Sequence, residues 1–150
     1  MAQFRSEIRE AVLENLRHHQ SWTELQVAST KTSHHLISGL PPHRIYVHPD
    51  EQVEALEVQR RTGQRPQQKA EYEWVLPFHA DESVTMNTLA TIFDSISAHP
   101  RGLPVEPLTP GLSDWTGARR GKRILMAVVH GDSTIVYYVL HDGMVKPRQN

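Results

Sequence analysis

The chain has 150 residues, with 16 Lys and Arg against 17 Asp and Glu, and it contains no cysteine. The balanced charge argues against strong nucleic-acid binding by this chain alone, because phosphate affinity comes from Lys and Arg. The lack of cysteine excludes disulfides, thiolate metal sites and cysteine nucleophiles. No apolar run approaches the roughly 18 residues of a membrane span, and the first residues do not resemble a signal peptide. We therefore expect a soluble, intracellular chain.

The first half of the chain predicts two helices and several short strands. Apolar residues recur at helical spacing between residues 6 and 19. Residues 22–28 and 34–37 have the pattern of two short strands that form a hairpin. Residues 44–48 are also strand-like, and Pro49 then begins a helix that stops before Gly63. That helix has only a narrow apolar stripe, so we expect it at the surface.

The second half begins with a strand and a helix of clearer character. Residues 71–77 alternate apolar side chains, and residues 84–98 carry one continuous apolar helical face. Residues 99–121 are rich in Pro and Gly and predict a long loop, a kind of segment that is usually functional or mobile. We expect one domain over residues 1–150, with a smaller N-terminal part at about 1–48 and a C-terminal part at about 71–147.

A hairpin is the most strongly predicted feature of the C-terminal part. Two apolar, β-branched runs at 124–129 and 134–140 flank the polar loop His130–Ser133. The turn Asp142-Gly143 then predicts a third short strand. The expected fold is α/β (α+β), with a mixed β-sheet packed against helices and a C-terminal β-hairpin.

The two strands of this hairpin differ in what can cover them. Residues 124–129 are apolar at every position, as in a strand covered on both faces, and the helix at 84–98 would cover one of them. Both alternating sets of residues 134–140 are apolar as well. A small chain cannot easily fill both of those faces, so we expect a partner surface there.

The sequence lacks the common motifs of catalytic and metal-binding sites. The ten histidines lack the spacing of a zinc site, and neither a nucleophile elbow nor a phosphate-binding loop occurs. No acid-x-Lys motif accompanies Pro49-Asp50, so a metal-dependent nuclease of that type is excluded. We predict no metal and no cofactor. One basic cluster is either a solvated flank or a contact to RNA phosphates; it comprises Arg119, Arg120, Lys122 and Arg123.

The run from Gly131 to Met144 closely resembles one family, the small non-catalytic subunit of the eukaryotic tRNA-splicing endonuclease. Three upstream segments agree with it in order: Ser21–Val27, His35–Pro42, and Glu73–Pro77 with its following helix. The resemblance covers most of the chain, apart from 99–121 and parts of 43–70.

This resemblance implies a tRNA-intron-endonuclease fold and a heterotetramer of two catalytic and two structural subunits. The family complex cuts precursor tRNA at both intron boundaries without a metal, leaving a 2′,3′-cyclic phosphate and a 5′-hydroxyl. The small structural subunit pairs with the catalytic subunit that cuts the 3′ boundary. The implied location is the nucleus or, as an alternative, the cytosolic face of the mitochondrial outer membrane.

Catalytic subunits of the family use a Tyr, a His and a Lys as base, acid and cation. Lys122 stands where the family's lysine does, but His79 follows the strand that the family's histidine precedes. We therefore predict no catalytic residue. Two alternatives remain: an RNA-cleaving homodimer that uses Lys122 with Tyr72 and His79, and a scaffolding domain unrelated to RNA.

The resemblance gives the hairpin its own roles. Its loop, with Gly131, Asp132 and Ser133, would insert into a basic cleft of a catalytic subunit in the opposite pair. The strand after the loop would pair with a partner subunit, or with a second copy when the chain is isolated. The predicted interface residues of that strand are Ile135, Val136, Tyr137, Tyr138 and Val139.

Overall fold

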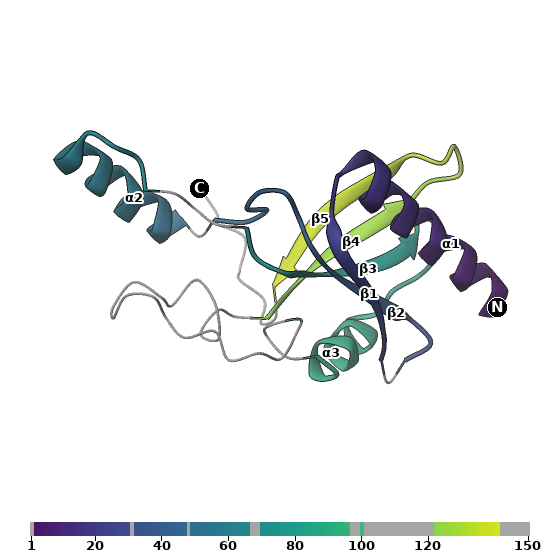
Figure 1. The fold of residues 1–150 in the computed structure, drawn as a ribbon. Helices are drawn as coiled ribbons and strands as arrows, with labels where there is room; N and C mark the ends of the chain where they lie inside the picture. Colours follow the sequence, from purple (N-terminus) through teal and green to yellow (C-terminus); the bar gives the residue numbers. More distant parts are fainter. Residues whose placement is uncertain are drawn as a thin grey trace.

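The computed structural model describes residues 2–30, 32–47, 49–66, 70–96, 100 and 122–141. Its elements confirm the predicted mixed α/β class and the C-terminal hairpin (Figure 1). They are, in chain order, α1 (Ala2–Glu14), the π-helix η1 (Asn15–His19), β1 (Thr23–Ser29), β2 (His35–Leu40), α2 (Pro49–Thr62), β3 (Glu73–His79), α3 (Met86–Asp94), β4 (Arg123–Val129) and β5 (Ile135–His141).

The strands form one five-stranded sheet in the order β1-β2-β3-β4-β5. Neighbouring strands are antiparallel except β3 and β4, which are parallel. A parallel pair needs a crossover connection, and here that connection contains α3. Since β2 pairs with β3, the N-terminal and C-terminal parts of the chain share this sheet.

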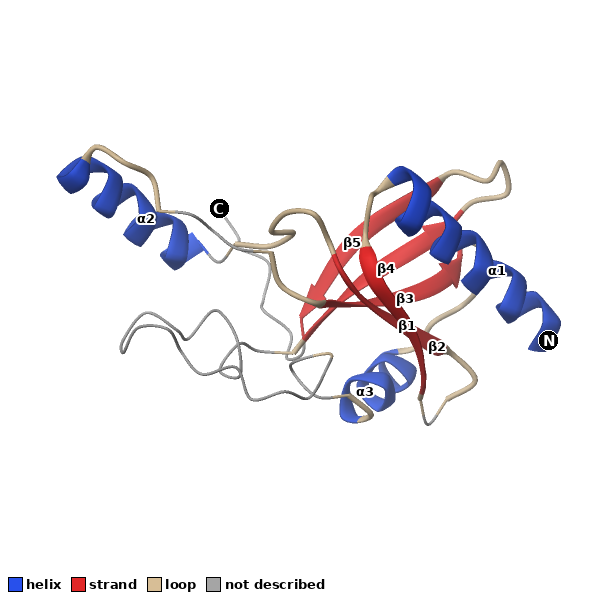
Figure 2. Cartoon of the chain, in the orientation of Figure 1, coloured by secondary structure: helices blue, strands red, loops and turns tan. Residues whose placement is uncertain are grey.

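Side chains on the two faces of the sheet enter separate cores. One core joins α1 to the sheet, and the other joins α3 to the opposite face (Figure 2). Neighbours in β4 divide between them, with Leu125 in the α1 core and Ile124 in the α3 core. Because side chains alternate along a strand, this division requires apolar residues at consecutive positions. The prediction that residues 124–129 are covered on both faces is confirmed.

The predicted strand at residues 44–48 is wrong over its described part, 44–47, which has no regular secondary structure. Side-chain contacts hold this segment instead of a strand ladder. Ile45 packs against the α1 core, and the Tyr46 ring lies 4.6 Å from the ring of His141 between centroids. A short run of β-branched and aromatic residues can occur in such a half-buried connection as well as in a strand, since both cover apolar side chains.

The predicted helices occur with different ends. The first begins earlier and finishes as a π-helix, while α3 begins after Thr85, whose hydroxyl accepts a hydrogen bond from the Thr88 N–H at 3.1 Å. The helix after Pro49 is confirmed as a surface helix, since Val53 and Leu56 are each 60% exposed. The third short strand and, apart from Pro100, the long loop at 99–121 lie outside the described residues.

Candidate partner interface

Strand β5 forms one edge of the sheet, and among the described residues only β4 pairs with it. The hairpin begins with the N–H of His130 donating to the carbonyl of Thr134 at 2.8 Å. Hydrogen-bonded pairs alternate along an antiparallel ladder. The backbone N–H and C=O groups of Ile135, Tyr137 and Val139 therefore face the open edge.

Some side chains of β5 pack in the two cores of this chain. Ile135 and Tyr137 pack against the α1 core, and the Tyr137 hydroxyl donates to Asn15 Oδ1 at 2.5 Å. Burial raises the pKa of Tyr137 to about 12, so its hydroxyl stays protonated as a donor. Leu140 packs against the α3 core on the other face. Ile135, Tyr137 and Leu140 of β5 thus contribute to the two cores of this chain.

Two apolar side chains of β5 remain accessible. Tyr138 is 50% exposed and Val139 is 36% exposed, while Val136 is half-buried. Successive side chains point to opposite faces, so Tyr138 and Val139 extend the open edge on both sides of the sheet. A partner strand added here would meet backbone donors and acceptors flanked by apolar groups.

The opposite edge of the sheet, β1, is built differently. Its register with β2 shifts between Thr23 and Gln26, and Glu24 within that shift has a φ of 54°. Glu24 also accepts a hydrogen bond from the hydroxyl of Tyr72. Bulges and charged residues discourage pairing at an edge, whereas β5 pairs with β4 through seven positions without a shift. The described sheet therefore has one guarded edge and one open edge.

The hairpin loop presents a single carboxylate. The N–H of Ser133 donates to the carbonyl of His130 at 2.9 Å, and Ser133 has a φ of 70°. Asp132 Oδ1 accepts from the backbone N–H of Thr134 at 3.1 Å. Hydrogen bonds from Thr134 hold the pKa of Asp132 below its usual value. This exposed carboxylate is therefore charged at neutral pH.

The two described residues of the predicted basic cluster, Lys122 and Arg123, contact other groups of this chain. Lys122 Nζ donates to the backbone carbonyl of Phe93 at 2.9 Å. Arg123 is only 4% exposed, and its guanidinium donates to both oxygens of Glu73, at 3.0 and 2.6 Å, and to Glu71 at 3.1 Å. These internal contacts do not support the predicted contact between Arg123 and an RNA phosphate, which stays a prediction. Arg119 and Arg120 lie outside the described residues.

The electrostatics of Arg123 agree with a structural role. Burial lowers the pKa of Arg123, but the hydrogen bonds and negative charges of Glu73 and Glu71 outweigh that effect and raise it overall. Arg44 extends the group, with its Nη2 at 2.8 and 3.0 Å from the carboxylate oxygens of Glu51 and its Nε 4.0 Å from Glu71. Sequence reasoning missed this network. Glu73 and Arg123, charged residues at the starts of two apolar strands, were the signal that could have revealed it.

The alternative catalytic set is contradicted by the topology. Tyr72 precedes β3 and His79 ends it, so roughly 20 Å of extended strand separates them. The parallel register that pairs Val75 with Leu125 brings Lys122 to the Tyr72 end. His79 is therefore remote from both other residues within one chain.

Among the described residues, no group of three or more His, Cys, Asp or Glu could hold a metal, and His48 and His99 lie outside them.

The fold defines a mixed α/β domain with an open edge strand, and its described helices include none long and apolar enough to cross a membrane. A family model described as Sen15 protein matches residues 11–150. The chain is 43% identical over 142 residues to the probable tRNA-splicing endonuclease subunit tsp-1 of Neurospora crassa, covering 93% of this chain and 64% of that protein. It is 31% identical over 144 residues to the probable tRNA-splicing endonuclease subunit sen15 of Schizosaccharomyces pombe, covering 93% and 80%.

This chain belongs to the Sen15 family of tRNA-splicing endonuclease subunits, which are non-catalytic, and the family predicted from the sequence is confirmed. It spans just under two thirds of the length of the Neurospora relative, at 64%. The family assignment argues against the scaffolding alternative without a connection to RNA.

Proposed function

We propose that this chain is a non-catalytic structural subunit of a tRNA-splicing endonuclease heterotetramer. It pairs with a catalytic subunit and supports cleavage of precursor tRNA at the intron boundaries, which leaves 2′,3′-cyclic phosphate and 5′-hydroxyl ends. The observation that supports this role most directly is the open edge of β5, with Tyr138 and Val139 exposed beside it.

Pairing through β5 would satisfy the unpaired backbone hydrogen-bonding groups of the open edge and would also cover apolar side chains. An added strand accepts and donates the edge hydrogen bonds of Ile135, Tyr137 and Val139, and it covers apolar surface on both faces. The guarded β1 edge offers no equivalent site, because its bulge interrupts the regular spacing of donors and acceptors. The difference between the two edges therefore supports assembly through β5.

The loop before β5 fits a second contact within the same assembly. Asp132 is exposed and charged, and the hydrogen bond that it accepts from the N–H of Thr134 links the carboxylate to the residue just before β5. We propose that Gly131, Asp132 and Ser133 enter a basic cleft of a catalytic subunit in the opposite pair. A single carboxylate supplies orientation and selectivity more than affinity.

The experiment is co-expression of this chain with the other endonuclease subunits, followed by sizing of the complex. Tyr138→Asp and Val139→Asp should prevent assembly, because each would bury a carboxylate without a partner. Val27→Asp is the matched control: Val27 is 45% exposed on the opposite edge strand and should tolerate the charge. A complex that survives both β5 substitutions would contradict the interface.

The isolated chain has the same edge available to a second copy. We propose that it forms a homodimer through β5 when no catalytic subunit is present. Sedimentation of the purified chain should show a dimer that Val139→Asp converts to a monomer and that Val27→Asp leaves unchanged. A wild-type monomer at high concentration would refute the self-pairing but not the heteromeric contact.

For its location we propose the nucleus, with the cytosolic face of the mitochondrial outer membrane as the alternative. Imaging of the tagged chain beside nuclear and mitochondrial markers distinguishes the two.

A further inference from the structure

Residues 49–66, which we call the arm, consist of α2 and the turn after it. The arm stands away from the sheet (Figures 1 and 2). Val53 and Leu56 are each 60% exposed, so α2 adds little to either core. An isolated helix of this length is only marginally stable in water. Packing among the described residues thus does not explain the part of α2 that extends away from the sheet.

The root of the arm, in contrast, is tied to the sheet. Glu51 near the start of α2 accepts both hydrogen bonds of Arg44, at 2.8 and 3.0 Å. Arg44 Nε lies 4.0 Å from Glu71, which in turn accepts from Arg123 at 3.1 Å. Arg123 is the first residue of β4. This succession of ion pairs holds the start of α2 beside the sheet while the rest of the helix extends into solvent.

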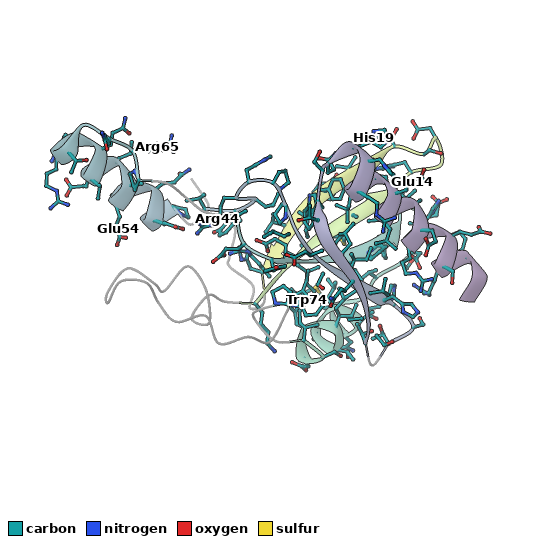
Figure 3. The ribbon with its side chains drawn as sticks, in the orientation of Figure 1. Glu14, His19, Arg44, Glu54, Arg65 and Trp74 are labelled. Carbon is teal, nitrogen blue, oxygen red and sulfur yellow. The ribbon has the colours of Figure 1, made fainter. Side chains whose placement is uncertain are left out.

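The arm carries acidic and basic side chains. The carboxylates of Glu51, Glu54 and Glu57 lie along α2, and Arg60 and Arg61 lie in its last turn. The chain then turns back beside the helix, so that Arg65 lies alongside α2 (Figures 1 and 3). Figure 3 shows Glu54 and Arg65 on opposite sides of α2. The arm therefore presents three exposed arginines, although the whole chain has a formal net charge of −1.

The helix dipole explains the positions of only some of these arginines. Arg60 and Arg61 in the last turn complement the negative end of the helix. Arg65 lies after Gly63, whose φ of 76° and hydrogen bond to the Gln59 carbonyl at 2.8 Å end the helix. Within the described residues, Arg61 and Arg65 form no ion pair, and Arg60 has only an exposed pair with Glu57 at 2.9 Å.

We propose that Arg60, Arg61 and Arg65 bind the phosphodiester backbone of the RNA that the assembled endonuclease cleaves. Guanidinium groups match phosphate geometry, and the exposed amides of Gln59 and Gln64 add further donors of the kind that contact phosphates. The inference rests on the proposed function and assigns an RNA contact to this chain.

A protein partner for the arm is less well supported. Val53 and Leu56 are the large exposed apolar residues of α2, and a stable protein interface buries about 800 Å² on each partner. Two side chains fall far short of that area. The exposed guanidinium groups of Arg60, Arg61 and Arg65 instead favour a phosphate-bearing partner, because affinity for phosphate comes from Lys and Arg.

The test uses the complete reconstituted endonuclease and a precursor tRNA substrate. The double substitution Arg61→Glu with Arg65→Glu should raise KM on the order of ten-fold and leave kcat unchanged, because two phosphate contacts are lost. The dependence of log affinity on log salt should become shallower by about 1.5, at roughly 0.7 to 0.9 for each contact. Arg17→Glu is the control, an exposed arginine of the π-helix far from the arm in sequence.

Any of three results would overturn the proposed RNA contact. An assembled complex whose KM and salt dependence do not change overturns the RNA contact and leaves the structural-subunit role intact. Loss of assembly in a Val53→Ser, Leu56→Ser variant, with no KM effect of the arginine substitutions, shows that the arm docks a protein and also overturns the RNA contact. A wild-type chain that does not assemble with the other subunits at all overturns both the proposed function and this inference.

Discussion

The hydroxyl of Tyr137 donates a 2.5 Å hydrogen bond to the side-chain oxygen of Asn15, joining β5 to the π-helix at the end of α1. A π-turn contains one residue more than an α-turn, which displaces the side chains that follow and often marks a functional position. The contact directs Tyr137 into this chain, while its neighbour Tyr138 is 50% exposed. The two tyrosines therefore have different roles.

Tyr137→Phe should lower the free energy of unfolding by about 1 kcal/mol, since it removes one partly buried hydrogen bond. Urea denaturation of the isolated chain measures this change. Tyr138→Phe is the matched control and should have almost no effect, because the side chain is exposed. Equal losses in the two variants would show that the Asn15 contact contributes nothing to stability.

Arg123→Ala should destabilise the chain by roughly 3–5 kcal/mol, because it leaves the buried carboxylate of Glu73 without its cation. The exposed Arg60–Glu57 pair provides the comparison, and Arg60→Ala should change stability by less than about 1 kcal/mol. Thermal unfolding measures both. The double variant Arg123→Met with Glu73→Leu should recover most of the loss, since it removes both charges; no recovery would contradict the ion-pair account.

His34 should make stability depend on pH. Its pKa is lowered by burial, and then by the charge of Arg5 and by His35, against an opposing effect of Glu82. As pH falls below the usual pKa of 6.5, the unfolded chain binds a proton that the folded chain resists, so stability decreases until the pH passes the lowered pKa.

The measurement compares the wild type with His34→Gln between about pH 7.5 and about pH 5.5. The stability difference between the two proteins should shrink toward low pH, because the variant lacks this titrating group. A difference that stays constant over that range would rule out His34 as the source. The ion pair of Arg5 with Glu82 at 2.8 Å is present in both proteins and cancels in the comparison.

Gly39→Ala should destabilise the chain by about 1–3 kcal/mol through overpacking. A Cβ at Gly39 would lie 2.6 Å from Leu25 Cδ2 and 3.0 Å from Trp22 Cε3, and the Trp22 ring is buried in the α1 core. Gly131→Ala is the control, since nothing lies within 4 Å of its added Cβ. Denaturation curves that shift equally for both variants would contradict the close packing at Gly39.

The local pattern of apolar residues was sufficient to predict the elements whose periodicity is strong. The apolar run at 124–129 predicted a strand covered on both faces, and the spacing at 84–98 predicted the helix that covers one of them. The segment at 44–48 shows the limit of that reasoning. Its run of β-branched and aromatic residues is typical of a strand, yet Tyr46 packs on His141 from the other end of the described chain. No local rule could supply that contact, because it depends on which segments the sheet brings together.

The sequence by itself determined the class of fold and the hairpin, because these depend on residue types and short-range spacing, and its resemblance to a known family was sufficient to predict the family. Only the tertiary structure decided that Arg123 is an internal ion-pair partner, that Tyr137 binds Asn15, and that within the described sheet β1 is a guarded edge while β5 is open. These properties depend on which side of a strand faces a neighbour. A shift of one residue in register exchanges those sides, so they are set by packing across the whole sheet.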